Sequence, residues 1–486
     1  MNWIIDANPC PGLFYGTRAQ DGFLLRIRTP GGKLTLSQGR AIARWMTDWD
    51  CDRLQVTNRG NLQLRSLTQA PSPEIFTELK TLGLAAPIPH VDQLRNIMAS
   101  PTAGIDADEL LDIRPWVQAL DHYIQQHRHL EALPAKFSIG IDGGGSVAIG
   151  TRSRLSWEHR YNEIQLSVVA PDGSNEDSSL LFHLALGAGK QLHDSGYVIP
   201  QDRGVEAVAA LTQAYLQYLS HAEPLPKPGR KRRMTHILAD WGLERYLHQA
   251  TRYQPQAFLK GQPLSLRPSA GAAHLGVHPQ RQPGLAYIGV DLPLGQVTRV
   301  QLQGILDVVA EFGQESLRLT PWQSLMIANI PENQVERVLE QLQGLGLSGE
   351  SPEVAIAACT GKPGCSAAAS TTQVEAQRLM EDLPQQLRLG RPVNIHLTAC
   401  PKSCAQPGPA EMTLLGLSLD CYHLYLGDGR DSWKHDLGPV AVEDLSRVVA
   451  GVLQSYKQQR HHRDESLSDW VRRLDGVGVQ VQECLR

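Results

Sequence analysis

The sequence predicts an α+β protein built on an internal duplication. Residues 21–65 and 284–328 align without a gap when 263 is added to each number of the first segment. Both segments show the alternation of half-buried strands and one apolar stripe at helical spacing. A third observation is two closely spaced pairs of cysteines in the last third of the chain. At 486 residues the chain is long enough for several domains.

The same order of elements is predicted in each copy: strand, glycine-containing turn, helix, strand, short turn, strand. The identical pairs are Pro30/Pro293, Gly32/Gly295, Thr35/Thr298, Gln38/Gln301 and Thr57/Thr320. The helical stripes are Ile42, Trp45, Met46 and Trp49 in the first copy and Ile305, Val308, Val309 and Phe312 in the second. Because so small a unit buries little surface alone, we expect the two copies to pack together.

Charge distinguishes the copies. Neutral or acidic residues of the second copy replace these cations of the first: Arg26, Arg28, Lys33, Arg40, Arg44, Arg53, Arg59 and Arg65. Alternation places Arg26, Arg28 and Arg65 on the strand face opposite the apolar one. Any single one of these arginines can be explained equally well as a residue exposed to solvent. The set as a whole favours a polyanionic ligand, because a guanidinium group binds carboxylates through two parallel hydrogen bonds.

The remaining segments suggest the domain boundaries. We expect a half-domain at 1–72, an α/β domain at 75–225, a second half-domain at 269–346 and a second α/β domain at 350–486. The basic stretch PLPKPGRKRRM is interpreted as part of a solvated connection over 226–268. The glycines at 143–145 and the stretch LGAGKQLH around Lys190 lack the spacing of nucleotide-binding loops.

Composition narrows the function classes. The net charge is −4, which gives no electrostatic reason to expect a nucleic-acid partner. The start MNWIIDANPCPG lacks the pattern of a secretory signal, and no apolar run reaches the ~20 residues of a membrane helix. Eight cysteines are too few for a disulfide scaffold, so we expect a cytoplasmic protein without a membrane partner.

Four cysteines form the most specific pattern. They are spaced C-x5-C and C-x3-C, whereas structural zinc usually shows knuckles of the C-x2-C or C-x4-C kind. Four thiolates suit the four corners of a 4Fe–4S cluster. The predicted cluster ligands are Cys359, Cys365, Cys400 and Cys404, and the scattered cysteines are Cys10, Cys51, Cys421 and Cys484.

This cysteine pattern resembles the signature of the nitrite and sulfite reductase superfamily, and the resemblance covers nearly the whole chain. It implies two ferredoxin-like half-domains paired across a pseudo-twofold axis, each followed by an α/β domain. It also implies a 4Fe–4S cluster beside a tetrapyrrole, with basic residues holding the tetrapyrrole carboxylates and the substrate. The matching positions are Arg59 in TNRGNLQLR, Arg95 in QLRNIMASPTAG and Lys136 in LPAKFS.

Three stretches further resemble the precorrin-3B synthase branch: PCPGLFYGTRAQDG, KFSIGIDGGG and CAQPGPAEMTLLG. That resemblance implies a monooxygenase of aerobic cobalamin biosynthesis, which uses oxygen to convert precorrin-3A to precorrin-3B. The tetrapyrrole would then be the substrate, and a mononuclear non-haem iron would accompany the cluster. His396 and Asp142 are candidate ligands of that iron, although a structural role is more common for such residues.

A ferredoxin-dependent nitrite or sulfite reductase is the alternative. Its tetrapyrrole would be sirohaem, bridged to the cluster through Cys404 by analogy with the family, and its electron donor a ferredoxin or a reductase. Sulfite reductases carry a second lysine where this chain has Ser138. The missing cation argues against sulfite as the substrate. Some nitrite reductases also lack that lysine. A non-catalytic electron carrier or tetrapyrrole-binding module is a third, less favoured hypothesis.

Overall fold

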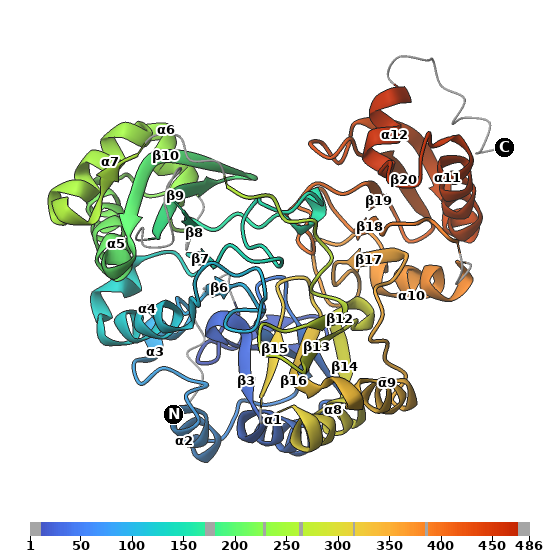
Figure 1. The fold of residues 1–486 in the computed structure, drawn as a ribbon, viewed down its shortest axis with the longest axis horizontal. Coiled ribbons are helices and arrows are strands. Elements are labelled where there is room, and N and C mark those ends of the chain that lie inside the picture. The colour runs from blue at the N-terminus through green and yellow to red at the C-terminus, as the bar shows by residue number, and fades with distance from the viewer. Residues whose placement is uncertain are drawn as a thin grey trace. The chain divides into compact units, whose positions relative to one another are not determined.

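A computed structural model describes residues 11–170, 180–226, 230–261, 266–313, 316–383 and 387–474 of the chain (Figure 1). Cys10 and Cys484 lie outside the described residues. The chain divides into two compact units. The first comprises Met1–Arg18, Gly22–Arg154 and Arg160–Gly349, and the second comprises Ala19–Asp21, Leu155–His159 and Glu350–Arg486. Each unit is described separately below.

The duplication predicted from the sequence is confirmed in the first unit. The first copy contains β2 (Gly22–Ile27), β3 (Lys33–Thr35), α1 (Leu36–Asp48), β4 (Arg53–Val56), β5 (Leu62–Leu67) and α2 (Pro73–Thr81). The second contains β13 (Leu285–Val290), β14 (Gln296–Thr298), α8 (Arg299–Phe312), β15 (Ser316–Leu319), β16 (Leu325–Pro331) and α9 (Val335–Gly344). Both copies therefore end in a helix, α2 or α9, beyond the last strand of the sequence repeat.

The two copies exchange one short strand. β3 pairs antiparallel with β15 of the other copy, and β14 pairs antiparallel with β4. With β1 (Thr17–Ala19) and β12 (Gly276–Pro279) added, the two sheets have the orders β1-β2-β5-β4-β14 and β12-β13-β16-β15-β3. Neither copy completes its own sheet, so the copies fold as one body related by a pseudo-twofold axis.

The threonine and the glutamine three residues after it occur in both copies because α1 and α8 begin with the same cap. Thr35 accepts a hydrogen bond from the backbone of Gln38, whose side chain accepts one from the backbone of Thr35, and Thr298 and Gln301 repeat this capping box. Gln38 Nε2 also donates to the carbonyl of Leu82, and Gln301 Nε2 does so to the equivalent Leu345. The retained threonines and glutamines thus start α1 and α8 and tie each helix to the loop after α2 or α9.

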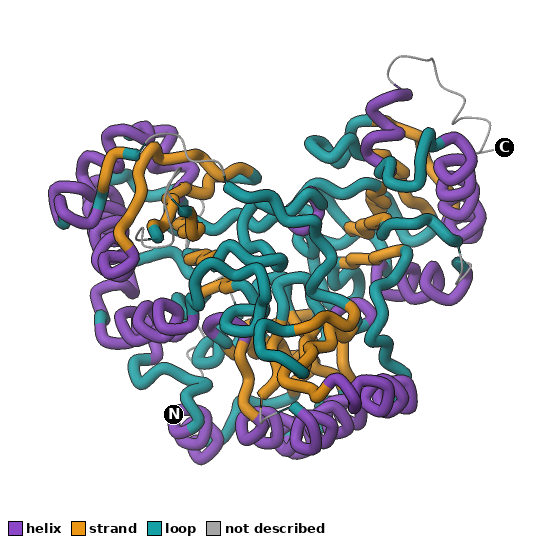
Figure 2. The backbone as a smooth tube through the Cα atoms, in the orientation of Figure 1, coloured by secondary structure: helices purple, strands orange, loops and turns teal. Residues whose placement is uncertain are grey.

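A single core joins the half-domains. α1 and α8 pack side by side on one side of the two sheets (Figures 1 and 2). Ile42, Trp45 and Met46 of α1 and Ile305 and Val309 of α8 are almost completely buried in the same apolar cluster. The apolar stripes predicted from the sequence are therefore buried in one core that both copies share, and the copies pack together as expected.

A mixed sheet forms the second layer of the first unit, in the order β11-β10-β9-β8-β7-β6. Its strands are β6 (Ile97–Ala99), β7 (Ile139–Asp142), β8 (Ile164–Val169), β9 (Leu181–Ala188), β10 (Gln191–Pro200) and β11 (Leu259–Lys260). β6, β7 and β8 are parallel, and β8 to β11 are antiparallel. The helices beside it are α3 (Pro89–Asp92), α4 (Arg114–Gln126), α5 (Gly204–His221), α6 (Met234–Asp240) and α7 (Gly242–Tyr253).

The connection predicted over 226–268 is wrong for much of its length. The described residues of this segment form α6, α7 and β11, and β11 is the edge strand of the mixed sheet. Met234, Ile237, Tyr246, Leu247 and Ala250 are buried in the core of this sheet. The apolar residues that follow the basic stretch at helical spacing determine the structure here, because burying them stabilises the helices against the sheet.

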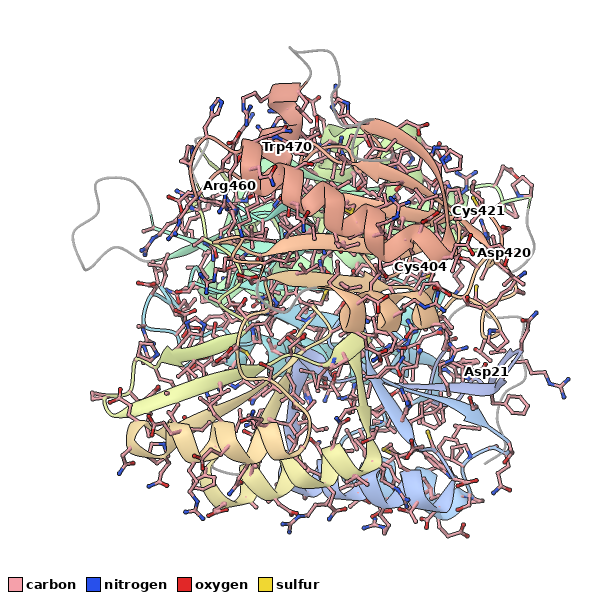
Figure 3. All side chains as sticks on the ribbon, turned by 90° about the vertical axis from the view of Figure 1, so that its right-hand side faces the viewer. Asp21, Cys404, Asp420, Cys421, Arg460 and Trp470 are labelled. Atoms are coloured by element: carbon pink, nitrogen blue, oxygen red, sulfur yellow. The ribbon has the colours of Figure 1, made fainter. Side chains whose placement is uncertain are left out.

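The second unit contains a five-stranded sheet in the order β17-β18-β19-β20-β21. Its elements are β17 (Val354–Ala358), α10 (Thr372–Asp382), β18 (Val393–Thr398), β19 (Met412–Gly416), β20 (Cys421–Leu426), β21 (His435–Ala441), α11 (Leu445–Gln459) and α12 (Leu467–Leu474). The first three strands are parallel. Trp470 of α12 and Arg460, which directly follows α11, both lie against Tyr456. Trp470 and Arg460 are labelled in Figure 3. No helix in the described part of the chain is long and apolar enough to cross a membrane.

Candidate functional site

The two cysteine pairs follow neighbouring parallel strands of the second unit. Cys359 comes directly after β17, and Cys400 follows two residues after the end of β18. Since β17 and β18 pair in parallel, their carboxyl ends lie at the same edge of the sheet. The backbone N–H of Cys359 donates to the carbonyl of Leu397 at 3.1 Å, and the N–H of Ala399 donates to Cys359 Sγ at 3.3 Å. The fold therefore brings together two loops that are distant in the sequence.

Both loops are held in place by their own backbone and by Thr372. Gly361 has φ +63°, and a Cβ at this position would lie 2.5 Å from Thr372 Oγ1, so this close approach requires glycine. Thr372 Oγ1 donates to the carbonyl of Cys359 at 2.8 Å, and the N–H of Cys365 donates to Gly361 at 2.9 Å. The N–H of Ala369 joins this loop to the other by donating to Ala399 at 3.0 Å.

The four cysteines supply the thiolate donors that an iron–sulfur cluster uses. Within the described residues, no three histidine, cysteine or acidic side chains converge as ligands of one ion. A cube takes one thiolate at each corner, so its ligands surround a volume rather than a point. The four thiols form no disulfide, and an N–H group already donates to one sulfur, an interaction that stabilises a thiolate. Cys359, Cys365, Cys400 and Cys404 would hold such a cluster.

Arg59 lies in a tight turn between β4 and β5. The N–H of Thr57 donates to Asn61 and that of Gly60 donates to Thr57, and Gly60 takes the positive φ that closes the turn. The second copy forms the same turn with Trp322 in place of Arg59. Trp322 is stacked on His274 with ring centroids 4.5 Å apart. One of two equivalent turns thus presents a half-buried cation, and the other an aromatic ring that packs within the protein.

Two of the three basic residues predicted from the sequence are in contact in the first unit, through the backbone of one of them. Arg59 Nη1 donates to the backbone carbonyl of Lys136 at 3.1 Å, and the side chain of Lys136 is exposed. Arg233, which precedes α6, donates to the same carbonyl from Nη2 at 3.4 Å. Arg233 is not among the site residues predicted from the sequence. The only signal for it was the basic stretch that had been interpreted as a connection.

Arg95 does not join this group. Its side chain is 3% exposed, and Nε and Nη2 donate to the two carboxylate oxygens of Asp121 at 2.7 and 3.0 Å. Nη2 also donates to the carbonyl of Gly83, and Asp92 lies 3.6 Å from Nη1. The guanidinium group of Arg95 therefore forms a buried ion pair that fixes α3 to α4. A role for Arg95 in ligand binding stays a prediction from the resemblance.

Two other cations of the first copy bind partners within the protein, and the anion-binding face stays a prediction for the rest. Arg28 is 2% exposed and donates to the carbonyls of Gln93 and Pro11, so it joins separate segments of the unit. Arg44 forms an ion pair with Glu78. A sequence pattern shows that the charges are present, but it does not show which of them are satisfied inside the protein.

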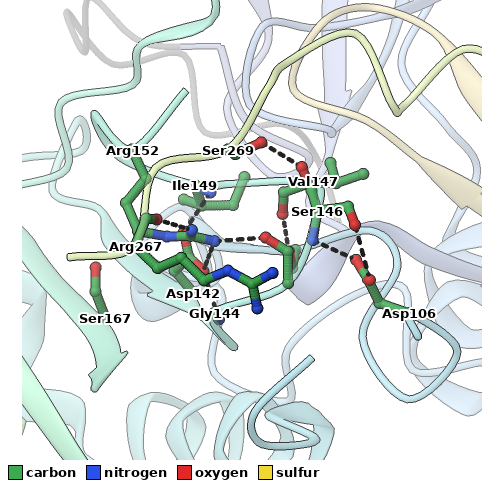
Figure 4. A network of polar contacts seen from close by, with 12 residues as sticks. Asp106, Asp142, Gly144, Ser146, Val147, Ile149, Arg152, Ser167, Arg267 and Ser269 are labelled. Atoms are coloured by element: carbon green, nitrogen blue, oxygen red, sulfur yellow. Dashed lines mark hydrogen bonds and ion pairs between the residues drawn. The ribbon is translucent and has the colours of Figure 1, made fainter. Parts of the chain in front are cut away.

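The stretch after β7 forms a buried polar network, shown in Figure 4. Asp142 is fully buried and accepts hydrogen bonds from Arg152 Nε and Nη2 at 3.0 and 2.9 Å. It also accepts from the N–H groups of Gly144 and Ile149, both at 2.8 Å. Both carboxylate oxygens of Asp142 are thus used within the protein. This arrangement indicates a structural role for Asp142 rather than iron binding.

Close packing explains the three glycines at 143–145. A Cβ on Gly143 would lie 2.6 Å from the carbonyl of Leu111, and one on Gly145 would lie 2.5 Å from Asp106 Oδ2. Gly144 has φ +85°. These glycines bring the loop against residues 106–111, so the structure accounts for them without a nucleotide. His396, the other candidate iron ligand, is 2% exposed within β18.

Comparisons with known proteins are consistent with this architecture. The model of the nitrite/sulfite reductase ferredoxin-like half domain matches residues 15–82 and 278–345, and that of the nitrite and sulphite reductase 4Fe-4S domain matches residues 90–258. The ferredoxin–nitrite reductase of Synechococcus elongatus is 30% identical over 467 residues, which cover 91% of this chain and 88% of that protein. The chain belongs to the nitrite and sulphite reductase family. It is an iron–sulfur oxidoreductase of that family.

Other members of the nitrite and sulphite reductase family are similar over comparable lengths. The chloroplastic ferredoxin–nitrite reductase of Spinacia oleracea is 26% identical, with 91% of this chain and 76% of that protein covered. The sulfite reductase [ferredoxin] 1 of Mycolicibacterium paratuberculosis is 25% identical, with 93% and 82% covered. The solved structure of the Mycobacterium tuberculosis NirA protein has a TM-score of 0.77 at 22% identity and covers 96% of this chain and 85% of that one. It therefore supports the fold predicted from the sequence.

Proposed function

We propose that this protein is a ferredoxin-dependent reductase of nitrite, with a 4Fe–4S cluster and a sirohaem-type tetrapyrrole. The observation that carries the proposal is the 30% identity to a ferredoxin–nitrite reductase over 91% of the chain. Cys359, Cys365, Cys400 and Cys404 would hold the cluster. Bound in this protein, the cluster and the tetrapyrrole would supply stepwise electron transfer and the iron on which nitrite is reduced.

The chain's own residues would bind and orient the tetrapyrrole. Lys136 is exposed and Arg59 is half-buried next to it, so both can pair with carboxylates at the edge of a macrocycle. Nitrite is favoured over sulfite because position 138 is a buried serine, 1% exposed, instead of the second lysine of sulfite reductases. With one cation fewer, a more highly charged oxyanion would be less well stabilised.

Purification without oxygen tests this proposal directly. The protein as isolated should contain extractable sirohaem in a one-to-one ratio to chain, together with iron and acid-labile sulfide. It should reduce nitrite when supplied with chemically reduced ferredoxin. Protein that carries the cluster but neither contains sirohaem nor reduces nitrite after sirohaem is added would contradict the proposal.

A precorrin-3B synthase is the second candidate, and two observations favour it. Ser138 removes one cation from the predicted oxyanion site, and the buried pair of Arg95 with Asp121 occupies another. A tetrapyrrole that is itself the substrate would not need those two charges beside a small anion. This candidate predicts protein that is brown as isolated, lacks sirohaem, and converts added precorrin-3A in the presence of oxygen and an electron donor.

A further inference from the structure

Thr372, the first residue of α10, lies directly against the predicted cluster ligand Cys359. Its side chain is 0% exposed, and Thr372 Oγ1 lies 3.4 Å from Cys359 Sγ. Oγ1 also lies 2.8 Å from the backbone carbonyl oxygen of Cys359. Gly361 packs closely against this hydroxyl, because a Cβ on Gly361 would come within 2.5 Å of Oγ1. One hydroxyl group therefore faces two acceptors of the same cysteine.

The protonation of Cys359 decides which acceptor the hydroxyl of Thr372 uses. A threonine hydroxyl has a single proton to donate. When Cys359 is a thiol, its S–H can donate to Oγ1 while the hydroxyl proton bonds the carbonyl. A cysteine that binds iron is a thiolate, which has no proton. The contact between Cys359 Sγ and Thr372 Oγ1 is then favourable only when the hydroxyl donates to the sulfur.

Gln373 allows this change of acceptor without leaving the carbonyl of Cys359 unpaired. Its Nε2 donates to that carbonyl at 2.8 Å and to the carbonyl of Ala358 at 3.2 Å. The carbonyl of Cys359 thus keeps a donor when the hydroxyl proton of Thr372 turns to the sulfur. A carbonyl without any donor would oppose the change, since an unpaired polar group is costly. Two consecutive side chains, Thr372 and Gln373, therefore supply donors to both the sulfur and the carbonyl of one predicted ligand.

We propose that Thr372 is a positioning residue for the iron–sulfur cluster and that its hydroxyl group donates a hydrogen bond to the thiolate of Cys359. This inference rests on the proposed function only through the cluster. Reduction by one electron adds a negative charge, part of which the thiolate sulfurs carry. A hydrogen bond to sulfur stabilises this added charge, so the hydroxyl of Thr372 raises the reduction potential of the cluster.

A redox titration tests the proposal. The full-length protein is purified without oxygen and reduced stepwise with dithionite, and electron paramagnetic resonance follows the signal of the reduced cluster. Thr372→Val replaces the hydroxyl by a methyl group of similar size. At a fixed solution potential, the ratio of reduced to oxidised cluster should fall about threefold in this variant, because a donor to sulfur is lost. For a one-electron couple, this ratio corresponds to a midpoint potential that is more negative by about 30 mV.

Two variants separate the hydrogen bond from packing. Thr372→Ser keeps the hydroxyl group and should retain the wild-type midpoint potential. A role in packing alone predicts the opposite order, because serine lacks the methyl group that valine keeps. Thr371→Val is the matched control, since it removes the hydroxyl of the neighbouring residue, whose Oγ1 lies 3.5 Å from Oε1 of Glu375, and should leave the midpoint unchanged. A wild-type midpoint in cluster-loaded Thr372→Val would overturn the proposal.

Gln373→Met provides a second measurement if Thr372→Val assembles no cluster. This variant removes the other donor to the carbonyl of Cys359, which then competes with the sulfur for the hydroxyl proton. The midpoint potential should again become more negative, and an unchanged midpoint would contradict the role of Thr372. The proposed function is tested separately. Wild-type protein that carries the cluster but does not reduce nitrite contradicts the proposed function alone, whereas wild-type protein without acid-labile sulfide contradicts both proposals.

Discussion

At the scale of single residues, the structure shows which of the predicted cations are buried and which keep an exposed side chain. Arg95 and Arg28 are equally well placed in the sequence pattern, yet both are buried and donate to groups of the protein. Arg59 and Lys136 lie together with an exposed ammonium group. Charge in a sequence therefore does not by itself indicate an anion site, because groups inside the protein bind some of the cations.

The cluster ligands give the sharpest test at this scale. Cys400→Ser should abolish the brown colour and the acid-labile sulfide of protein purified without oxygen, because a serine oxygen is a poor ligand for a soft iron–sulfur cube. Cys421→Ser is the matched control, since Cys421 lies on β20 of the same unit and is not one of the four predicted ligands. Sulfide retained at the wild-type level in Cys400→Ser would contradict the ligand assignment.

A buried acid gives a prediction for pH. Burial raises the pKa of Glu109 from 4.5 to about 7, and its side chain is 2% exposed. Between these values the folded protein holds a proton that the unfolded chain has lost. The free energy of unfolding should therefore fall as the pH rises from about 4.5 to about 7, by up to about 1.4 kcal/mol per pH unit.

Glu109→Gln should remove this contribution, because glutamine does not titrate. Urea midpoints at about pH 5 and about pH 8 measure the slope in the wild type and in the variant. Glu332→Gln changes an exposed acid of the first unit and serves as the control. An unchanged slope in Glu109→Gln would show that another group is responsible for it.

At the scale of elements, the exchange of β3 and β14 joins the half-domains. It brings backbone from one copy against backbone of the other, and glycine allows the approach. Gly32 has φ +75°, and a Cβ on it would lie 2.2 Å from the carbonyl oxygen of Leu319. Gly295, its equivalent, has φ +70°, and a Cβ on it would lie 2.8 Å from Gln323 Cβ and 3.0 Å from the carbonyl oxygen of Val56. The two equivalent glycines of the repeat are thus required by a contact between the copies as well as by a turn within each copy.

Gly32→Ala should destabilise the protein by more than its positive φ alone predicts. A left-handed φ costs a non-glycine residue about 1–3 kcal/mol, and the collision with Leu319 adds to that cost. Gly83→Ala is the matched control, because Gly83 has φ +70° and open space around the missing Cβ. The difference between the two urea midpoints measures the effect of the strand exchange. Equal midpoints would show that the exchange tolerates a methyl group.

At the scale of the whole molecule, a duplicated scaffold carries different chemistry in its two copies. The turns at Arg59 and Trp322 have the same backbone hydrogen bonds, yet one carries a cation next to Lys136 and the other a tryptophan stacked on His274. The two copies thus share the backbone geometry of this turn, whereas their side chains differ. Such an arrangement allows one copy to bind a ligand while the other stabilises the unit.

The repeat and the strands could be predicted because they depend on residues close together in the sequence, and the four cluster ligands stay a prediction from their spacing. Thr35 and Gln38 cap a helix three residues apart, and each cysteine pair lies within one loop. Helices α6 and α7 were missed because the basic stretch before them resembles a connection. Their apolar residues become informative only when the core that buries them is known.

The sequence by itself determined the duplication, the order of elements in each half-domain and the four cysteines. Only the tertiary structure decided which groups the predicted cations contact. Arg59 and Arg233 reach the carbonyl of Lys136 across 77 and 97 positions of the chain, whereas Arg95 turns toward Asp121 inside the unit. Local periodicity specifies which face a side chain occupies, but long-range packing selects its partner. The partner is decided by which polar and charged groups become buried together when distant segments of the chain pack against each other.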